Sequence, residues 1–126
     1  MLLVDDSRGF IQGLEAYLKH SEEIAIKGIA RSGAECLEKI GKLDLDVILM
    51  DIRMETAKAG LLTAKKIKEQ KLTRSKIIFL TSEYHKSDIC KALSMDCSFV
   101  DKSCSVPYLI TLLKRILFHN RVIIYI

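Results

Sequence analysis

Short apolar segments alternate along this chain with longer segments in which apolar residues recur at helical spacing. The short segments contain many β-branched residues and lie at residues 2–4, 24–29, 47–50, 77–80 and 98–100. Strands of this length with continuous apolar character are expected in a sheet that is covered on both faces. The helical segments are marked by the groups Phe10, Leu14 and Leu18; Ala34, Leu37 and Ile40; Leu61, Ala64 and Ile67; Ile89, Cys90 and Leu93; and Leu109, Leu113, Ile116 and Leu117.

The alternation predicts an α/β fold with a parallel sheet and helices on both faces, a three-layer sandwich. The length of 126 residues suits one domain with one core. We expect residues 1–118 to form that domain and residues 119–126 to be a tail or the start of a linker.

Composition excludes several classes of protein. The net charge of +4 is spread along the chain, which argues against a nucleic-acid surface. The apolar runs are too short to cross a bilayer, and the first residues do not resemble a signal peptide. The four cysteines have no metal-ligand spacing and no pairing pattern. We therefore expect a cytoplasmic protein with reduced cysteines and no membrane partner.

Polar side chains follow four of the five predicted strands. Asp5 and Asp6 follow the first, Asp51 the third, Thr81 ends the fourth and Lys102 follows the fifth. In an open parallel sheet, ligands bind beyond the carboxyl ends of the strands, near the point where strand order reverses. We expect these five side chains to meet there.

Three neighbouring carboxylates repel one another unless a cation joins them. Oxygen ligands on one side of a site suit Mg²⁺ better than zinc or copper. An aspartate can attack phosphorus and form an acyl phosphate, and transfer then needs positive charge on the phosphoryl oxygens. Mg²⁺ and the ammonium of Lys102 would supply that charge, and Thr81 can donate a hydrogen bond to a phosphoryl oxygen.

The chain resembles the receiver domains of two-component response regulators over residues 2–118. The matching segments are LLVDD at the start, DVILMDIRM, GLLTAKKIKE, FLTS at 79–82 and FVDKS at 99–103. The resemblance implies a flavodoxin-like fold with five strands in the order 2-1-3-4-5. It also implies that Asp51 accepts a phosphoryl group from a histidine kinase, so the chain catalyses only its own phosphorylation and dephosphorylation.

The resemblance assigns roles to further residues. Mg²⁺ would be held by Asp6, Asp51 and the backbone carbonyl of Arg53, with Asp5 contacting it mainly through water. Thr81 would be the switch hydroxyl and Lys102 the partner of the phosphoryl group. Phe99 would be the aromatic residue that changes rotamer, moving from the surface into the space that Thr81 vacates.

The chain departs from the family pattern in the loop after Asp51. Met54 is followed by Glu55 rather than proline, and Gly60 comes one residue late, so residues 55–59 contain an insertion. Lys102 precedes Ser103, which resembles the branch whose receivers precede a LuxR-type helix-turn-helix. Many family members have a cis proline there, and the geometry of this bond stays open.

Arg53 and Glu83 each lie two residues after a key position, where the family tunes loss of the phosphoryl group. We expect them to pair and to hinder an attacking water. The face formed by residues 86–118 is expected to control the output, which we expect to be transcription, and to form a homodimer. DNA would be bound only by an output domain outside this chain. The tail at 121–126 is apolar and β-prone, and the sequence does not decide its role.

Two other functions are consistent with parts of this pattern. A receiver can act as a phosphorylation-independent interaction module. A phosphatase with an aspartate nucleophile uses similar residues, but it needs a second acid two positions after the nucleophile, where this chain has Arg53. An FMN-binding protein is disfavoured because Asp5 and Asp6 would repel the phosphate of FMN.

Overall fold

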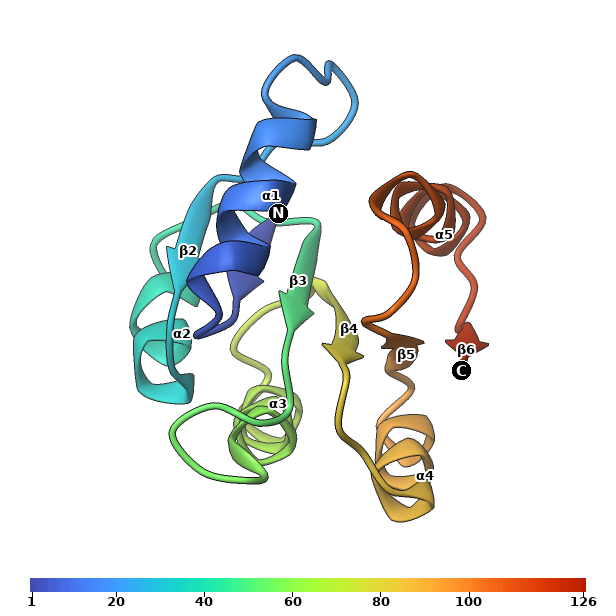
Figure 1. Ribbon diagram of the computed structural model, residues 1–126. Helices are drawn as coiled ribbons and strands as arrows, with labels where there is room; N and C mark the ends of the chain where they lie inside the picture. Colours follow the sequence, from blue (N-terminus) through green and yellow to red (C-terminus); the bar gives the residue numbers. More distant parts are fainter.

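Six parallel strands and five helices form the structure, a computed structural model that describes residues 1–126 (Figure 1). The strands are β1 (Leu2–Val4), β2 (Gly28–Ala30), β3 (Val47–Met50), β4 (Lys76–Thr81), β5 (Ser98–Asp101) and β6 (Ile124–Tyr125). The helices are α1 (Arg8–Leu18), α2 (Gly33–Ile40), α3 (Ala59–Gln70), α4 (Lys86–Ser94) and α5 (Val106–Phe118). None of the helices is long and apolar enough to span a bilayer.

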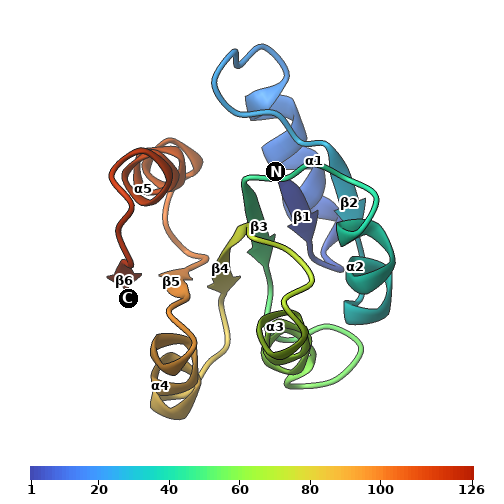
Figure 2. The same ribbon diagram turned by 180° about the vertical axis from the view of Figure 1, so that it is seen from behind.

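The sheet has the strand order β2-β1-β3-β4-β5-β6, which confirms the predicted order and adds one strand at its end. Helices α1 and α5 cover one face, and α2, α3 and α4 cover the other (Figures 1 and 2). Alternation along the strands produces the two cores. Leu2 and Val4 point toward α2 and α3, whereas Leu3 between them points toward α1.

The helices begin where the sequence provides a cap. The hydroxyls of Ser7, Ser32 and Ser105 accept hydrogen bonds from the third residue of α1, α2 and α5, respectively. Pro107 occupies the first turn of α5, where its missing N–H has no intrahelical partner to lose. These starts place the loops that precede α1 and α5 at the carboxyl edge of the sheet.

The tail that the sequence left undecided forms β6. The amide of Phe99 donates to the carbonyl of Ile123 at 2.9 Å, and the amide of Ile123 donates to Ser98 Oγ at 3.0 Å. The ring of Tyr125 packs against that of Tyr108, with 5.0 Å between the centroids. The tail therefore covers the outer edge of β5, which lies in the face expected to form a dimer.

The predicted apolar face of α4 was confirmed at Ile89, which packs against the core, and was wrong at its other two residues. Cys90 and Leu93 are exposed, and the helix buries Asp88 and Ala92 instead. Asp88 is buried because its carboxylate accepts the amide of His85 at 2.8 Å and so caps the start of the helix. The buried Asp88 cap therefore determines which face of this nine-residue helix packs against the core.

The second strand is shorter than the predicted segment 24–29. Its paired residues begin at Gly28, because the backbone before it bonds to the chain terminus. The amino group of Met1 donates to the carbonyl of Ala25 at 2.8 Å, and the amide of Lys27 donates to the carbonyl of Met1 at 2.8 Å. All four cysteines are free thiols, and Cys36 and Cys97 are buried as small apolar side chains.

Candidate functional site at the carboxyl edge of the sheet

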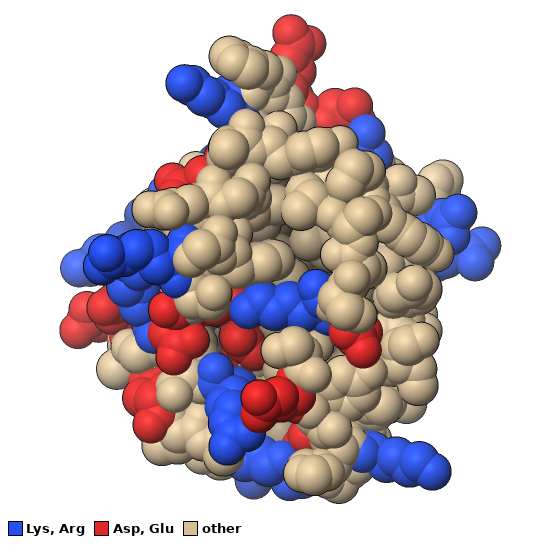
Figure 3. All heavy atoms as spheres, viewed as in Figure 1, with Lys and Arg blue, Asp and Glu red and all other residues tan.

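The loops after β1 and β3 bring three carboxylates together. One carboxylate oxygen from each of Asp5, Asp6 and Asp51 lies within 4.8 Å of the others. Asp5 and Asp51 are 1% and 8% exposed, whereas Asp6 is exposed, so the cluster opens to solvent on the side of Asp6. On the face shown in Figure 3, acidic and basic side chains meet near the middle of the molecule.

Lys102 reaches this cluster from the end of β5. Its Nζ lies 2.6 Å from Oδ2 of Asp5 and 3.2 Å from Oδ2 of Asp51. The ammonium also lies 4.5 Å from the centroid of the Phe10 ring, at a distance suited to a cation–π contact. The backbone amide of Lys102 donates to the carbonyl of Thr81 at 2.9 Å, which attaches the lysine to β4 as well.

Burial and charge shift the pKa values of two residues in this cluster. Burial raises the pKa of the Asp5 carboxyl, and the hydrogen bonds from Lys102 and from the amide of Ser7 oppose that rise only in part. Burial alone would lower the pKa of Lys102, but the carboxylates of Asp5 and Asp51 outweigh it and raise this pKa above its ordinary value. One ammonium therefore faces a cluster with a surplus of negative charge.

The donor set fits a hard divalent cation. Oδ1 of Asp51 is buried and has no hydrogen-bond partner, although buried carboxylate oxygens are normally paired. All nearby side-chain ligands are oxygens, and the open side leaves positions for water, as Mg²⁺ prefers. The residues present are thus suited to hold Mg²⁺.

The insertion at 55–59 is accommodated away from the acidic cluster. The carboxylate of Glu55 accepts the amide of Gly33 at 2.9 and 3.0 Å, which holds the loop against the start of α2. At Gly60 the chain again lies next to the site, and the amide of Gly60 donates to the carbonyl of Ile52 at 2.8 Å. A Cβ on Gly60 would lie 2.0 Å from the carbonyl oxygen of Asp51, so only glycine fits there. The loop after Asp51 therefore packs closely despite its extra residue.

The expected switch residues lie together, but Phe99 does not start at the surface. The hydroxyl of Thr81 is buried and donates to the carbonyl of Glu83 at 3.3 Å. Phe99 is fully buried, with the ring of Tyr84 against it at 4.9 Å between centroids and Ile124 of β6 packed on the same core. The expectation of an exposed Phe99 is wrong because the loop before α4 and the tail both cover it.

Ion pairs join the loop after β3 to the loop after β4 and to the first turn of α4. Nη1 of Arg53 lies 2.5 Å from Oε2 of Glu83, and both side chains are largely exposed. Nζ of Lys58 lies 2.6 Å from Oδ1 of Asp88, which is 1% exposed. Burial alone would raise the pKa of Asp88, but Lys58 and the amide of His85 hold that pKa below its ordinary value.

The contacts that three residues make at or near this site were not predicted from the sequence. Tyr84 and Asp88 lie in or after the loop that follows β4, and Phe10 lies in α1. An acidic residue three positions after a helix start, as in His85 to Asp88, is the pattern of a capping box and could have indicated a buried carboxylate. The peptide bond between Lys102 and Ser103 is trans, since the chain has no cis peptide bond.

Comparison with known proteins agrees with this architecture. The family model of the response regulator receiver domain matches residues 1–114. The response regulator protein VraR of Staphylococcus saprophyticus is 31% identical over 93 residues, which cover 74% of this chain and 44% of that protein. The transcriptional regulatory protein LnrK of Bacillus subtilis is also 31% identical over 93 residues, covering 74% of this chain and 41% of that protein.

A solved structure extends the agreement to nearly the whole fold. A two-component response regulator of the LuxR family from an Aurantimonas species superposes with a TM-score of 0.83 at 20% identity. The superposition covers 97% of this chain and 86% of that one. The chain spans less than half the length of the two curated relatives.

Proposed function

Because this chain belongs to the response regulator receiver domain family, we propose that it accepts a phosphoryl group on Asp51 from a histidine kinase. The observation that supports this most directly is the arrangement around Asp51. Its carboxylate lies beside two further acids and the ammonium of Lys102, and one of its buried oxygens has no partner. Such an arrangement suits a carboxylate that receives a phosphoryl group better than one with a structural role.

The residues suited to hold Mg²⁺ are Asp5, Asp6 and Asp51, together with the backbone carbonyl of Arg53. When bound, Mg²⁺ would neutralise negative charge on the phosphoryl oxygens and the carboxylates. Lys102 is held against Asp5 and Asp51 by ion pairs, so its ammonium is already close to where the phosphoryl group would arrive. The chain thus supplies both the acids and one fixed cation.

Asp51 acts as the nucleophile in this proposal. A carboxylate oxygen attacks phosphorus, the new P–O bond forms, and the P–N bond to the kinase histidine breaks; the departing imidazole takes its proton from solvent. Lys102 then turns from Asp5 toward a phosphoryl oxygen. Thr81 exchanges its hydrogen bond to the carbonyl of Glu83 for one to another phosphoryl oxygen.

The movement of Thr81 would transmit the change to the output face. The hydroxyl is bonded within the loop after β4, and that loop contains Tyr84, which covers Phe99. Loss of the bond to Glu83 loosens the loop and lets Phe99 and α4 rearrange, which biases a two-state element. We propose that this alters the face formed by residues 86–118 and, with it, homodimerisation.

Because β6 covers the edge of β5, a dimer through this face must bury or displace the tail.

Arg53 and Glu83 are proposed to tune loss of the phosphoryl group. Their ion pair joins the loop that begins at Asp51 to the loop after β4, and both side chains are largely exposed. A water that attacks phosphorus would have to pass these side chains. The pair would therefore lengthen the lifetime of the phosphorylated state.

The output is proposed to be transcriptional, in a cytoplasmic regulator of the LuxR type. The relatives VraR and LnrK are a response regulator and a transcriptional regulatory protein by name, and both are longer than this chain. Residues 1–118 would be the receiver. DNA would be contacted only through an output domain outside the present sequence.

The proposal is tested by incubating the protein with Mg²⁺ and acetyl phosphate and measuring its intact mass. We expect one added phosphoryl group, which is lost on omitting Mg²⁺ and absent in Asp51→Asn. Asp46→Asn is a matched control, because this exposed acid precedes β3 at the opposite end of the strand. Absence of the adduct in a folded protein would leave the phosphorylation-independent interaction module as the better reading.

A further inference from the structure

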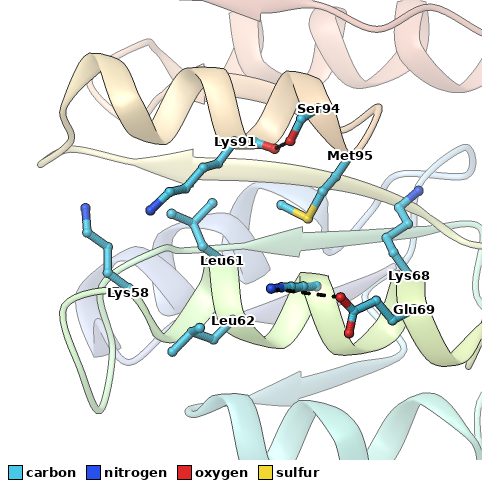
Figure 4. Close-up of a pocket in the computed structure, with 9 residues that line it drawn as sticks. Lys58, Leu61, Leu62, Lys68, Glu69, Lys91, Ser94 and Met95 are labelled. Atoms are coloured by element: carbon cyan, nitrogen blue, oxygen red, sulfur yellow. Dashed lines mark hydrogen bonds and ion pairs between the residues drawn. The ribbon is translucent and has the colours of Figure 1, made fainter.

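A groove between α3 and α4 is not used by the proposed phosphoryl transfer. It has a volume of about 570 Å³ and opens on the face of the sheet that α2, α3 and α4 cover. Figure 4 shows side chains of α3 and α4 on its two sides. The groove combines an apolar floor with a basic rim, so both features must be explained together.

The floor of the groove is made by a leucine of α3 and a methionine that follows α4, and a second leucine of α3 lies at its edge. Leu61 points toward α4 and is 5% exposed, and Met95 points from α4 toward α3 (Figure 4). Leu62 lies at the outer edge of the groove, on the side of α3 that faces away from α4 (Figure 4), and is 60% exposed, which is unusual for a leucine on a helix that packs against a sheet. An exposed leucine next to a hollow is available for contact with a partner.

The rim of the groove is basic. Four lysines and one glutamate line it, a net charge of +3: Lys58, Lys65, Lys68, Lys91 and Glu69. Lys58 is paired with Asp88. Nζ of Lys65 lies 3.9 Å from Oε1 of Glu69, and because both side chains are exposed, this ion pair contributes little to stability. Lys68 and Lys91 take part in none of the ion pairs of the chain. The positive charges of these two lysines are therefore not neutralised by an ion pair within the chain.

The groove is elongated along the helix. Residues that line it recur on one stripe from Lys58 to Glu69, at intervals of three and four residues. At 1.5 Å per residue the stripe extends for about 16 Å, roughly three turns. Lys91 of α4 and Met95, which follows that helix, form a second, shorter stripe. Two parallel stripes with an apolar floor match a helix better than a compact small molecule.

We propose that this groove binds an acidic amphipathic helix of a partner protein. Apolar side chains on one face of that helix would contact Leu61, Leu62 and Met95. Acidic side chains beside them would pair with Lys65 and Lys68 on one rim and Lys91 on the other. The groove is formed in the unphosphorylated chain, and Asp51 is not among the residues that line it.

The first test uses a fluorescent helical peptide of about 16 residues, with leucines on one face and glutamates flanking them. Fluorescence anisotropy should show saturable binding that weakens as salt increases, since the contacts are partly electrostatic. Amide chemical shifts should change along α3 and α4. A peptide of the same composition in scrambled order is the control for nonspecific charge attraction.

Charge reversal locates the contact. The triple variant Lys65→Glu, Lys68→Glu and Lys91→Glu should weaken binding about tenfold or more, equivalent to about 1.4 kcal/mol. The matched control Lys19→Glu, Lys27→Glu and Lys42→Glu changes the net charge equally at exposed lysines far from α3 and α4, and should weaken binding far less. Leu62→Ala should also weaken binding, because it removes apolar contact while leaving the charge unchanged.

Several outcomes would overturn the inference. These are absence of saturable binding, equal binding of the scrambled peptide, equal losses in the two triple variants, or chemical shift changes confined to another surface. Binding to phosphatidylglycerol vesicles with the same lysine dependence, but no binding of the peptide, would reassign the groove to anionic lipid. All variants alter exposed side chains, and circular dichroism verifies that each is folded.

Discussion

The hydroxyl of Tyr84 donates a 2.6 Å hydrogen bond to Oδ2 of Asp101, while its ring packs edge-on against Phe99. Tyr84 belongs to the loop before α4 and Asp101 to the end of β5, so this bond closes the loop over the strand. Asp101 points away from Asp5 and Asp51, whereas its neighbour Lys102 points toward them, as strand alternation requires. The bond therefore links the residue before Lys102 to the loop that follows Thr81.

Removing this hydroxyl should alter the pH dependence of stability. The hydrogen bond from Tyr84 lowers the pKa of Asp101. A carboxyl whose pKa is lowered on folding stabilises the fold above its unfolded pKa, and this contribution is lost as the pH falls through the folded pKa. Tyr84→Phe should cost about 0.5–1 kcal/mol near neutral pH and less under acid, where Asp101 is protonated. Urea denaturation at several pH values measures this. Tyr17→Phe, at an exposed tyrosine, should change neither quantity.

Lys102→Ala should destabilise the protein most when Mg²⁺ is absent. The variant leaves Asp5, which is 1% exposed, and Asp51 without their shared ammonium. An unpaired buried charge is costly, and we expect a loss of about 2 kcal/mol or more. Mg²⁺ should restore more stability in the variant than in the wild type, because the carboxylates then lack any other cation. Thermal unfolding with Mg²⁺ and with EDTA measures the difference; an equal response of the two proteins would contradict it.

Gly60→Ala should disturb both stability and phosphorylation. The added Cβ would meet the carbonyl oxygen of Asp51 at 2.0 Å, so the backbone beside the nucleophile must move. We expect a loss of about 2 kcal/mol and slower formation of the phosphorylated protein. Gly13→Ala is the matched control: it lies within α1, where a Cβ meets nothing, and it should raise stability by about 0.5–1 kcal/mol. Opposite signs of the stability change in the two variants would show that the loss at Gly60 comes from close packing and not from the general effect of replacing glycine with alanine.

Replacing Arg53 and Glu83 together with alanine should shorten the lifetime of the phosphorylated protein while leaving its stability nearly unchanged. Both side chains are largely exposed, so their ion pair contributes little to folding. Access of water to Asp51 would nevertheless increase. The decay of the phosphorylated mass after removal of acetyl phosphate gives the lifetime. An unchanged lifetime would refute a protective role for the pair.

Deleting residues 121–126 should favour association of two copies. The tail pairs with β5 and packs Tyr125 against Tyr108, so its removal uncovers an unpaired strand edge. Sedimentation over a range of concentrations should detect a larger dimer fraction than in the full chain. A truncated protein that is folded and remains monomeric at high concentration would exclude the β5 edge as the contact.

Much of the fold and site followed from the sequence because it depends on order along the chain. Once the strands were recognised, parallel pairing brought Asp5, Asp51 and Lys102 to one edge whatever the details of the helices. Pairings between distant loops were harder to predict from the sequence. Lys58 and Asp88 are thirty residues apart, and neither lies after a strand in a way that signals its partner. The buried position of Phe99 depended on Tyr84 and Ile124, whose packing is set only in the folded chain.

The added strand β6 also allows detachment of the tail to be measured by amide hydrogen exchange. The amide of Phe99 donates to the carbonyl of Ile123 in the tail, while the amide of Lys102 at the end of β5 donates to Thr81 of β4. If β6 detaches without wider unfolding, deuterium will replace the proton of Phe99 long before that of Lys102. The ratio of the two exchange rates then reports how often the tail leaves, in a protein that carries no label.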